Sequence, residues 1–236
     1  MTNAQNNDTK MKFILNRVDD RSNHSVGWIV GYGLLFWLIT RIIAVVLLFI
    51  CSNIYSRYGI NPEELTKFAG MPDSLHHSFY IVITAALMAP LIEECIFRLG
   101  LSFKRRHVAL GASAIPAYIA WQRLIYQKWW ITSLWFVGAV ILFCSIYFLT
   151  NDQLWSKLKN KFLRPAIWTS ALAFGLVHLI AFSDYSLQLV PYMLCVILVP
   201  LFGGFAITYY RINLGFWWGV GLHIFNNLPA VIMLCQ

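Results

Sequence analysis

Seven long apolar runs, separated by shorter polar stretches, dominate the chain. A run of about 20 apolar residues can cross the hydrocarbon layer of a bilayer as a helix. The pattern therefore predicts an all-α fold, a polytopic transmembrane helical bundle with about seven spans. The third run is the weakest, because it is short and contains Pro116. The predicted spans are residues 26–50, 79–102, 107–121, 130–150, 165–183, 188–210 and 214–234.

The polar stretches divide the chain into three parts. They are a polar N-terminal tail (1–25), a first span with a long loop (26–78), and a helical core (79–234). The sequence Asn-Pro-Glu-Glu at 61–64 in the loop predicts a turn that opens a short surface helix. We find no internal repeat, and we expect the spans to form one bundle.

Composition supports a membrane location. Only 12% of residues are charged, against about a quarter in soluble domains. The net charge of +8 comes from short Lys and Arg clusters between apolar runs, which is typical of loops facing anionic lipid and does not indicate nucleic-acid binding. With seven spans, twelve of the 18 basic residues fall on the side of the N-terminus, which predicts a cytoplasmic N-terminus. The small size and the lack of an organelle-retention signal favour a bacterial cytoplasmic membrane.

Two adjacent glutamates, Glu93 and Glu94, interrupt the second predicted span. A charged carboxylate near the centre of a bilayer costs roughly 2.5–3.5 kcal/mol on insertion scales. Arg98 follows Glu94 by four residues, so the two side chains share a helix face and can pair. Glu93 points about 100° away around the helix, and no second cation is nearby in sequence. We interpret Glu94 with Arg98 as a structural ion pair and Glu93 as the functional carboxylate.

Two later spans also carry polar side chains. His178 lies in the fifth span, and His223 and Asn227 lie one helical turn apart in the seventh. With a rise of about 1.5 Å per residue, Glu93 and both histidines lie roughly 16–21 Å from the nearest cytoplasmic basic residues. Because a polar group facing lipid is costly, we expect these residues to converge on one pocket.

Each of these residues also has a structural interpretation. His178 by itself is as typical of a hydrogen bond between helices as of catalysis, and Asn227 by itself is more typical of helix–helix contact. Prolines in three of the spans predict kinks that can open backbone groups toward a cavity. Arg41 in the first span can pair with a carboxylate or reach toward the interface, and we assign it no role.

Three motifs in separate spans carry a family resemblance. They are Glu-Glu-x-x-x-Arg (93–98), Phe-x-x-x-His (174–178) and His-x-x-x-Asn (223–227), in this order. Together they resemble the CAAX prenyl endopeptidase and bacteriocin-processing family of intramembrane proteases, also called the abortive-infection family. The resemblance covers residues 79–234. In one local departure, Leu99 stands where the family often has Gly directly after the Arg.

The resemblance implies an intramembrane protease that hydrolyses a peptide bond with a glutamate-activated water. Glu93 would activate the water, and His178 would position it. His223 and Asn227 would donate hydrogen bonds to the oxyanion of the tetrahedral intermediate. The second glutamate and the arginine of the first motif would hold the helix around Glu93. The implied partners are the bilayer and a membrane-associated peptide or protein, which is lipidated for some family members.

Zinc chemistry is an alternative to this mechanism. Glu93, His178 and His223 together form a set of two histidines and one carboxylate that suits catalytic zinc. The His-Glu-x-x-His helix of membrane zinc proteases is absent from the sequence. The family resemblance also favours the glutamate mechanism, so we expect no metal cofactor.

Three other functions remain open at this point. A Gly-x-Ser sequence ending at Ser113 resembles the serine motif of rhomboid-type proteases, but the final Gly of that motif is missing. A proton-coupled transporter could use the glutamates and histidines as a relay, although the chain shows no paired halves. A non-catalytic scaffold or immunity protein could keep the same pocket to bind a peptide.

Overall fold

The computed structural model describes residues 25–60, 82–123, 128–182 and 187–234, and all regular structure in these ranges is helical. Four helical segments are long and apolar enough to cross a membrane. Together they support the expected helical membrane protein. These four segments are Val26–Arg57, Trp129–Leu149, Asp152–Ile180 and Leu187–Asn213.

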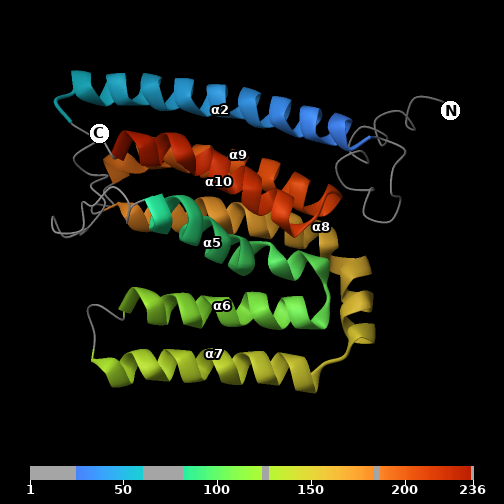
Figure 1. Ribbon diagram of the computed structural model, residues 1–236. Coiled ribbons are helices and arrows are strands. Elements are labelled where there is room, and N and C mark those ends of the chain that lie inside the picture. Colours follow the sequence, from blue (N-terminus) through green and yellow to red (C-terminus); the bar gives the residue numbers. More distant parts are fainter. Residues whose placement is uncertain (1–24, 61–81, 124–127, 183–186, 235–236) are drawn as a thin grey trace.

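Each predicted span coincides with a helical segment, and consecutive segments run in alternating directions (Figure 1). Within the described ranges, α6, α7, α9 and α10 match their predicted bounds within three residues, whereas α2 continues seven residues past its predicted end. The bounds of these helices are α2 Val26–Arg57, α6 Arg105–Arg123, α7 Trp129–Leu149, α9 Val190–Asn213 and α10 Phe216–Leu234.

The second predicted span is not one continuous helix. It consists of a π-helix, η2 (Val82–Met88), then α5 (Ala89–Phe97), then a 3₁₀ turn, η3 (Leu99–Ser102). Pro90 lies in the first turn of α5 and has no N–H to donate to the preceding turn. The proline therefore accounts for the change of helix type just before the two glutamates.

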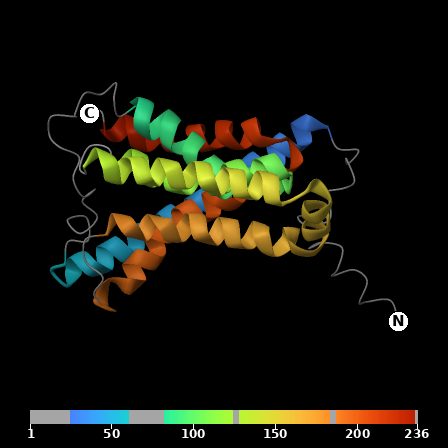
Figure 2. The same ribbon diagram turned by 90° about the horizontal axis from the view of Figure 1, so that it is seen from below.

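The fifth predicted span starts earlier than expected. We predicted a loop up to residue 164, but α8 extends from Asp152 to Val177. Asn151 caps the helix, because its Oδ1 accepts a 2.8 Å hydrogen bond from the N–H of Leu154. Pro165 lies inside α8, and the part before it bends away from the rest (Figures 1 and 2). The basic cluster of the predicted loop thus lies on a helical extension.

The surface of the bundle is apolar. Large side chains along α2 and α7 are turned outward; Phe49 is 70% exposed and Val140 62%. Contiguous exposed apolar faces of this extent are not stable in water, whereas lipid tails accommodate them. This pattern agrees with the membrane assignment made from composition.

Helix α9 lies at the centre and packs against α2, α8 and α10. Small residues permit the close approaches: a Cβ on Gly33 of α2 would lie 2.2 Å from the ring of Tyr210. A Cβ on Gly175 of α8 would lie 3.1–3.3 Å from side-chain and backbone atoms of α9. Such small residues are typical of membrane helix interfaces. Helices α6 and α7 form a hairpin that contacts this core through α5 and η3 (Figure 1).

The predicted surface helix after residue 61 and nearly all of the N-terminal tail lie outside the described residues. The division of the chain into three parts therefore stays a prediction. The membrane orientation also stays a prediction.

Candidate active site

The helix changes from π-helical to α-helical between Met88 and Ala89, next to Pro90, and this break in helix type lies just ahead of the glutamates. Helix α5 is only nine residues long and carries Glu93 and Glu94 in its middle. Ahead of the break, the carbonyl of Ala85 accepts a hydrogen bond of 3.3 Å from the side-chain amide of Asn227 on α10. The seventh predicted span thus satisfies a backbone group near the break in the second, and the two segments are joined beside the glutamates.

Glu94 and Arg98 form the predicted ion pair, and both side chains are completely buried. Arg98 Nε also donates to Thr208 Oγ1 on α9 at 3.2 Å. Its guanidinium lies over the ring of Phe174 on α8, 4.2 Å from the centroid. A Cβ on Gly204 would lie 3.0 Å from both the guanidinium and this ring, so a larger residue would force one of them to shift by a few tenths of an ångström.

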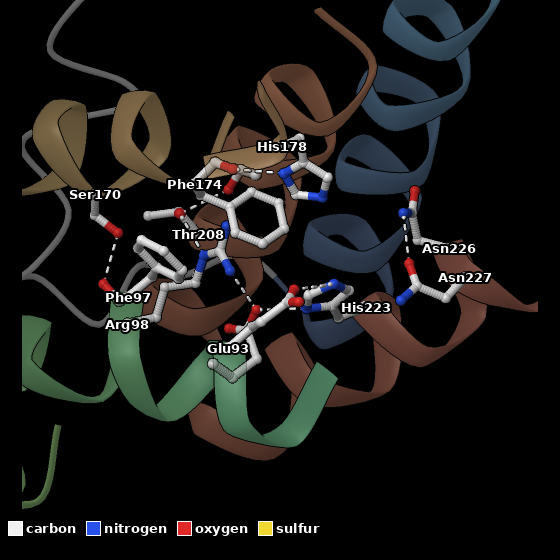
Figure 3. Close-up of polar contacts among 12 residues, drawn as sticks. Glu93, Phe97, Arg98, Ser170, Phe174, His178, Thr208, His223, Asn226 and Asn227 are labelled. Atoms are coloured by element: carbon white, nitrogen blue, oxygen red, sulfur yellow. Dashed lines mark hydrogen bonds and ion pairs between the residues drawn. The ribbon is translucent and has the colours of Figure 1, made fainter. Parts of the chain in front are cut away.

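His223 bridges the two glutamates (Figure 3). Its Nδ1 lies 2.8 Å from Glu94 Oε1, and its Nε2 lies 3.4 Å from Glu93 Oε2. Glu94 Oε1 also accepts from Arg98, and a proton on Nδ1 of His223 lets this nitrogen donate to the same oxygen. Nε2 of His223 then faces Glu93 and can exchange a proton with it. The four groups form a continuous chain from the arginine to Glu93.

Glu93 differs from its neighbour in exposure. Its side chain is 22% exposed, whereas that of Glu94 has no exposed surface. The side chain of Glu93 therefore keeps some accessible surface. Glu94 has none.

His178 lies on the other side of Phe174 from Arg98 in the close-up (Figure 3). Its Nδ1 is 2.8 Å from the carbonyl of Phe174, and since a carbonyl only accepts, Nδ1 carries a proton. In the neutral ring Nε2 is then an acceptor. The ring of Phe174 makes edge contacts with both His178 and His223, at centroid distances of 5.1 and 5.3 Å. This aromatic ring sets the spacing of the two imidazoles.

Asn226 extends the polar cluster to α2. Its Oδ1 accepts a 3.0 Å hydrogen bond from the indole N–H of Trp37 and a second from Arg41. Its amide donates to Asn227 Oδ1 at 3.3 Å. The first span, which the family resemblance leaves out, thus reaches the candidate site through two side chains. Arg41 pairs with an amide instead of a carboxylate.

His223 contacts both Glu93 and Glu94, and Glu94 pairs with Arg98. The depth argument expected Glu93, His178 and His223 in one pocket; His178 contacts Phe174, whose ring also contacts His223. Asn227, one turn after His223, bonds to Asn226 and Ala85. Asn226, Thr208 and Trp37 were not predicted to take part. The adjacency of Asn226 to Asn227 was the one available signal, while the other two side chains are chemically ordinary in a membrane helix.

Two alternatives can be compared with this geometry. Among the described residues, no group of three or more His, Cys, Asp or Glu side chains is arranged to share a metal ion. Ser113 Oγ donates to the carbonyl of Leu110 in its own helix, at 3.0 Å. That bond is a local helix contact and does not resemble an activated nucleophile.

Comparison of the chain with protein-family models, with curated proteins and with solved structures finds no significant match. The motifs and the geometry of the polar cluster are therefore the features that bear on function.

Proposed function

We propose that this protein is an intramembrane endopeptidase in which Glu93 activates a water molecule. The observation that carries the proposal is the buried chain Arg98–Glu94–His223–Glu93, which ends in a partly exposed carboxylate. A charged network of this kind within apolar helices is expensive to maintain, and such groups in membrane proteins usually serve function. The three motifs behind the family resemblance all contribute to this cluster. We infer membership of that protease family on these grounds.

In the proposed reaction, Glu93 accepts a proton from water while the water oxygen attacks the carbonyl carbon of the scissile peptide bond. The carbonyl oxygen takes up the electron pair of the C=O π bond and becomes the oxyanion of the tetrahedral intermediate. When the intermediate collapses, the C–N bond breaks and the proton passes from Glu93 to the leaving amine. Glu94 holds Nδ1 of His223, so Nε2 stays directed at Glu93. His223 thereby orients Glu93 and can share the proton that Glu93 takes from water.

His178 and Asn227 each have a hydrogen-bonding group that can serve the remaining steps. His178 Nε2, as an acceptor, can hold one hydrogen of the attacking water. Asn227 donates one amide hydrogen to Ala85 and has a second for the oxyanion. The predicted oxyanion role of His223 is harder to reconcile with its contacts, because both ring nitrogens face glutamates. We therefore assign His223 to the proton chain.

The proposal includes a membrane topology and a substrate class. Seven crossings with a cytoplasmic N-terminus agree with the alternating directions of the helical segments (Figure 1) and with the distribution of Lys and Arg along the sequence. The substrate would be a membrane-associated peptide or protein, with or without a lipid group, in a bacterial cytoplasmic membrane. The proposed chemistry requires neither zinc nor another cofactor.

The test compares the peptides in membranes of cells that produce wild type, Glu93→Gln, or Ser113→Ala protein. We expect a set of cleavage products that disappears with Glu93→Gln and persists with Ser113→Ala. The cleavage would then be reproduced with purified protein in lipid nanodiscs, with and without a zinc chelator. The expected result is hydrolysis that is insensitive to the chelator.

Three results would contradict the proposal. Full cleavage by Glu93→Gln would remove Glu93 from the mechanism. Loss of cleavage with Ser113→Ala alone would indicate a serine protease. A partner that binds wild type and Glu93→Gln equally, with no product that depends on Glu93, would indicate a scaffold.

A further inference from the structure

A basic cleft of about 550 Å³ opens at the end of the bundle where α7 connects to α8. It is separate from the polar cluster around Glu93, although η3 links the two along the chain. One wall is the segment that follows η3, and the other is the first part of α8. The charged residues that line it are Lys104, Arg105, Arg106, Asp152 and Lys159.

The charge of this cleft suits a multivalent anion. The described lining holds four cations and one carboxylate. The carboxylate, Asp152, is engaged within the protein: its Oδ1 accepts the backbone N–H of Arg105 at 3.3 Å, and it lies in the first turn of α8. A helix N-terminus stabilises a negative charge at that position. An excess of positive charge is therefore left facing the cleft.

Part of the cleft is preorganised. The guanidinium of Arg105 lies over the ring of Tyr147, 4.5 Å from its centroid, and donates to the carbonyl of Thr150 at 3.3 Å. Phe103 adopts a left-handed conformation with φ of 52°, and this turn directs the three following basic residues along the cleft wall. Ser102 Oγ accepts the N–H of Lys104 at 3.3 Å and stabilises the turn.

The cleft lies at the end of a candidate membrane span. It adjoins the last residues of α7, a candidate membrane span, where Phe148 is 73% exposed and Leu149 83%. A ligand in the cleft would thus have cations on one side and an apolar helix end on the other. The cations match the charged head group of a phospholipid, and the apolar helix end matches its acyl chains.

We propose that this cleft binds the phosphate group of an anionic phospholipid, with the acyl chains along the end of α7. Arginine and lysine bind phosphate oxygens through charge-assisted hydrogen bonds, and basic pockets between membrane helices are known recognition sites for lipid head groups. The proposal is independent of catalysis, so its failure would leave the proposed peptidase untouched.

Binding would be measured with short-chain phosphatidylglycerol titrated into the full-length protein in a neutral detergent, where no bilayer surface potential contributes. Short-chain phosphatidylcholine is the reference ligand. We compare Lys104→Gln/Arg106→Gln with Lys157→Gln/Lys161→Gln, which removes the same charge from α8 outside the cleft lining. All four side chains are exposed, and thermal unfolding of each variant would verify the fold.

We expect phosphatidylglycerol to bind wild type at least tenfold more tightly than phosphatidylcholine. The cleft variant should lose roughly tenfold in affinity, and the matched variant less than threefold. Equal losses in the two variants would overturn the proposal, since they would reflect the general charge of that end of the protein. Equal binding of the two lipids would overturn it as well.

A titration with inorganic phosphate distinguishes a phospholipid head group from a soluble phosphate ligand, because both present phosphate oxygens to the cleft. Weak binding of phosphate relative to the lipid supports a phospholipid site that also uses the acyl chains. Phosphate binding as tight as that of the lipid would overturn the lipid assignment in favour of a soluble phosphate ligand.

Discussion

Glu94 and Glu93 are adjacent in sequence, yet they belong to two different environments. The Glu94 side of the cluster is closed: Arg98 and His223 contact a carboxylate with no exposed surface, and Thr208 holds Arg98 in turn. The Glu93 side is more open: its side chain is 22% exposed, and within the described part of the chain its carboxylate lies against Nε2 of His223. Two adjacent residues on a short helix thus point in different directions: Glu94 forms a stabilising ion pair, whereas Glu93 can contact a substrate.

The largest expected effect is on the closed side. Arg98→Leu leaves the Glu94 carboxylate buried without its counter-ion, and breaking such a pair typically costs about 3–5 kcal/mol. We expect a corresponding loss in free energy of unfolding, measured by thermal or denaturant unfolding in mild detergent. The double variant Glu94→Gln/Arg98→Leu should recover at least half of it. If the double variant is as unstable as the single one, the buried charge is not the cause.

The open side should show the reverse behaviour. Glu93→Gln keeps the shape of the side chain and removes its ability to accept a proton. We expect the rate of substrate cleavage to fall by about 10²–10⁴-fold. The free energy of unfolding should change by less than about 1 kcal/mol. A loss of stability as large as that of Arg98→Leu would mean that both glutamates are structural.

A smaller effect is expected where α2 joins the cluster. Arg41→Gln weakens the contact with Asn226, and single hydrogen bonds between membrane helices are worth about 0.6 kcal/mol, up to about 1.7 kcal/mol. We expect a loss of stability in that range and a reduction in cleavage of a few fold, because Asn226 positions Asn227. The matched control is Arg57→Gln at the exposed end of α2, which should have neither effect. If Arg41→Gln and Arg57→Gln have the same stability and the same cleavage rate, α2 does not contribute to the site.

The smallest effect is expected at Ser170. Its hydroxyl donates a 2.6 Å hydrogen bond to the carbonyl of Phe97 at the end of α5. Ser170→Ala should cost about 0.6 kcal/mol in unfolding measurements. Ser133→Ala is the control, because Ser133 Oγ donates within its own helix, to Trp129. If both variants are equally stable, the hydrogen bond between α8 and α5 contributes nothing to the free energy of unfolding.

Much of the fold followed from hydrophobic patterning. The seven apolar runs matched seven helical segments because a lipid-facing helix must be apolar along most of its length. The pairing of Glu94 with Arg98 followed from a spacing of four residues. The early start of α8 was missed because its first turns are polar, and the apolar pattern begins only near Pro165.

The sequence by itself determined that the carboxylates and the imidazoles lie in separate helices, and the rise per residue predicts similar depths for them. Only the tertiary structure decided which groups meet. His223 reaches both glutamates because the break before α5 lets α10 pack against it, and Arg41 reaches Asn226 because Gly33 lets α2 approach α9. These contacts depend on helix rotation and close packing between distant segments, which no local pattern encodes. The separation of Glu93 from Glu94 into an open and a closed environment is therefore a property of the packed bundle.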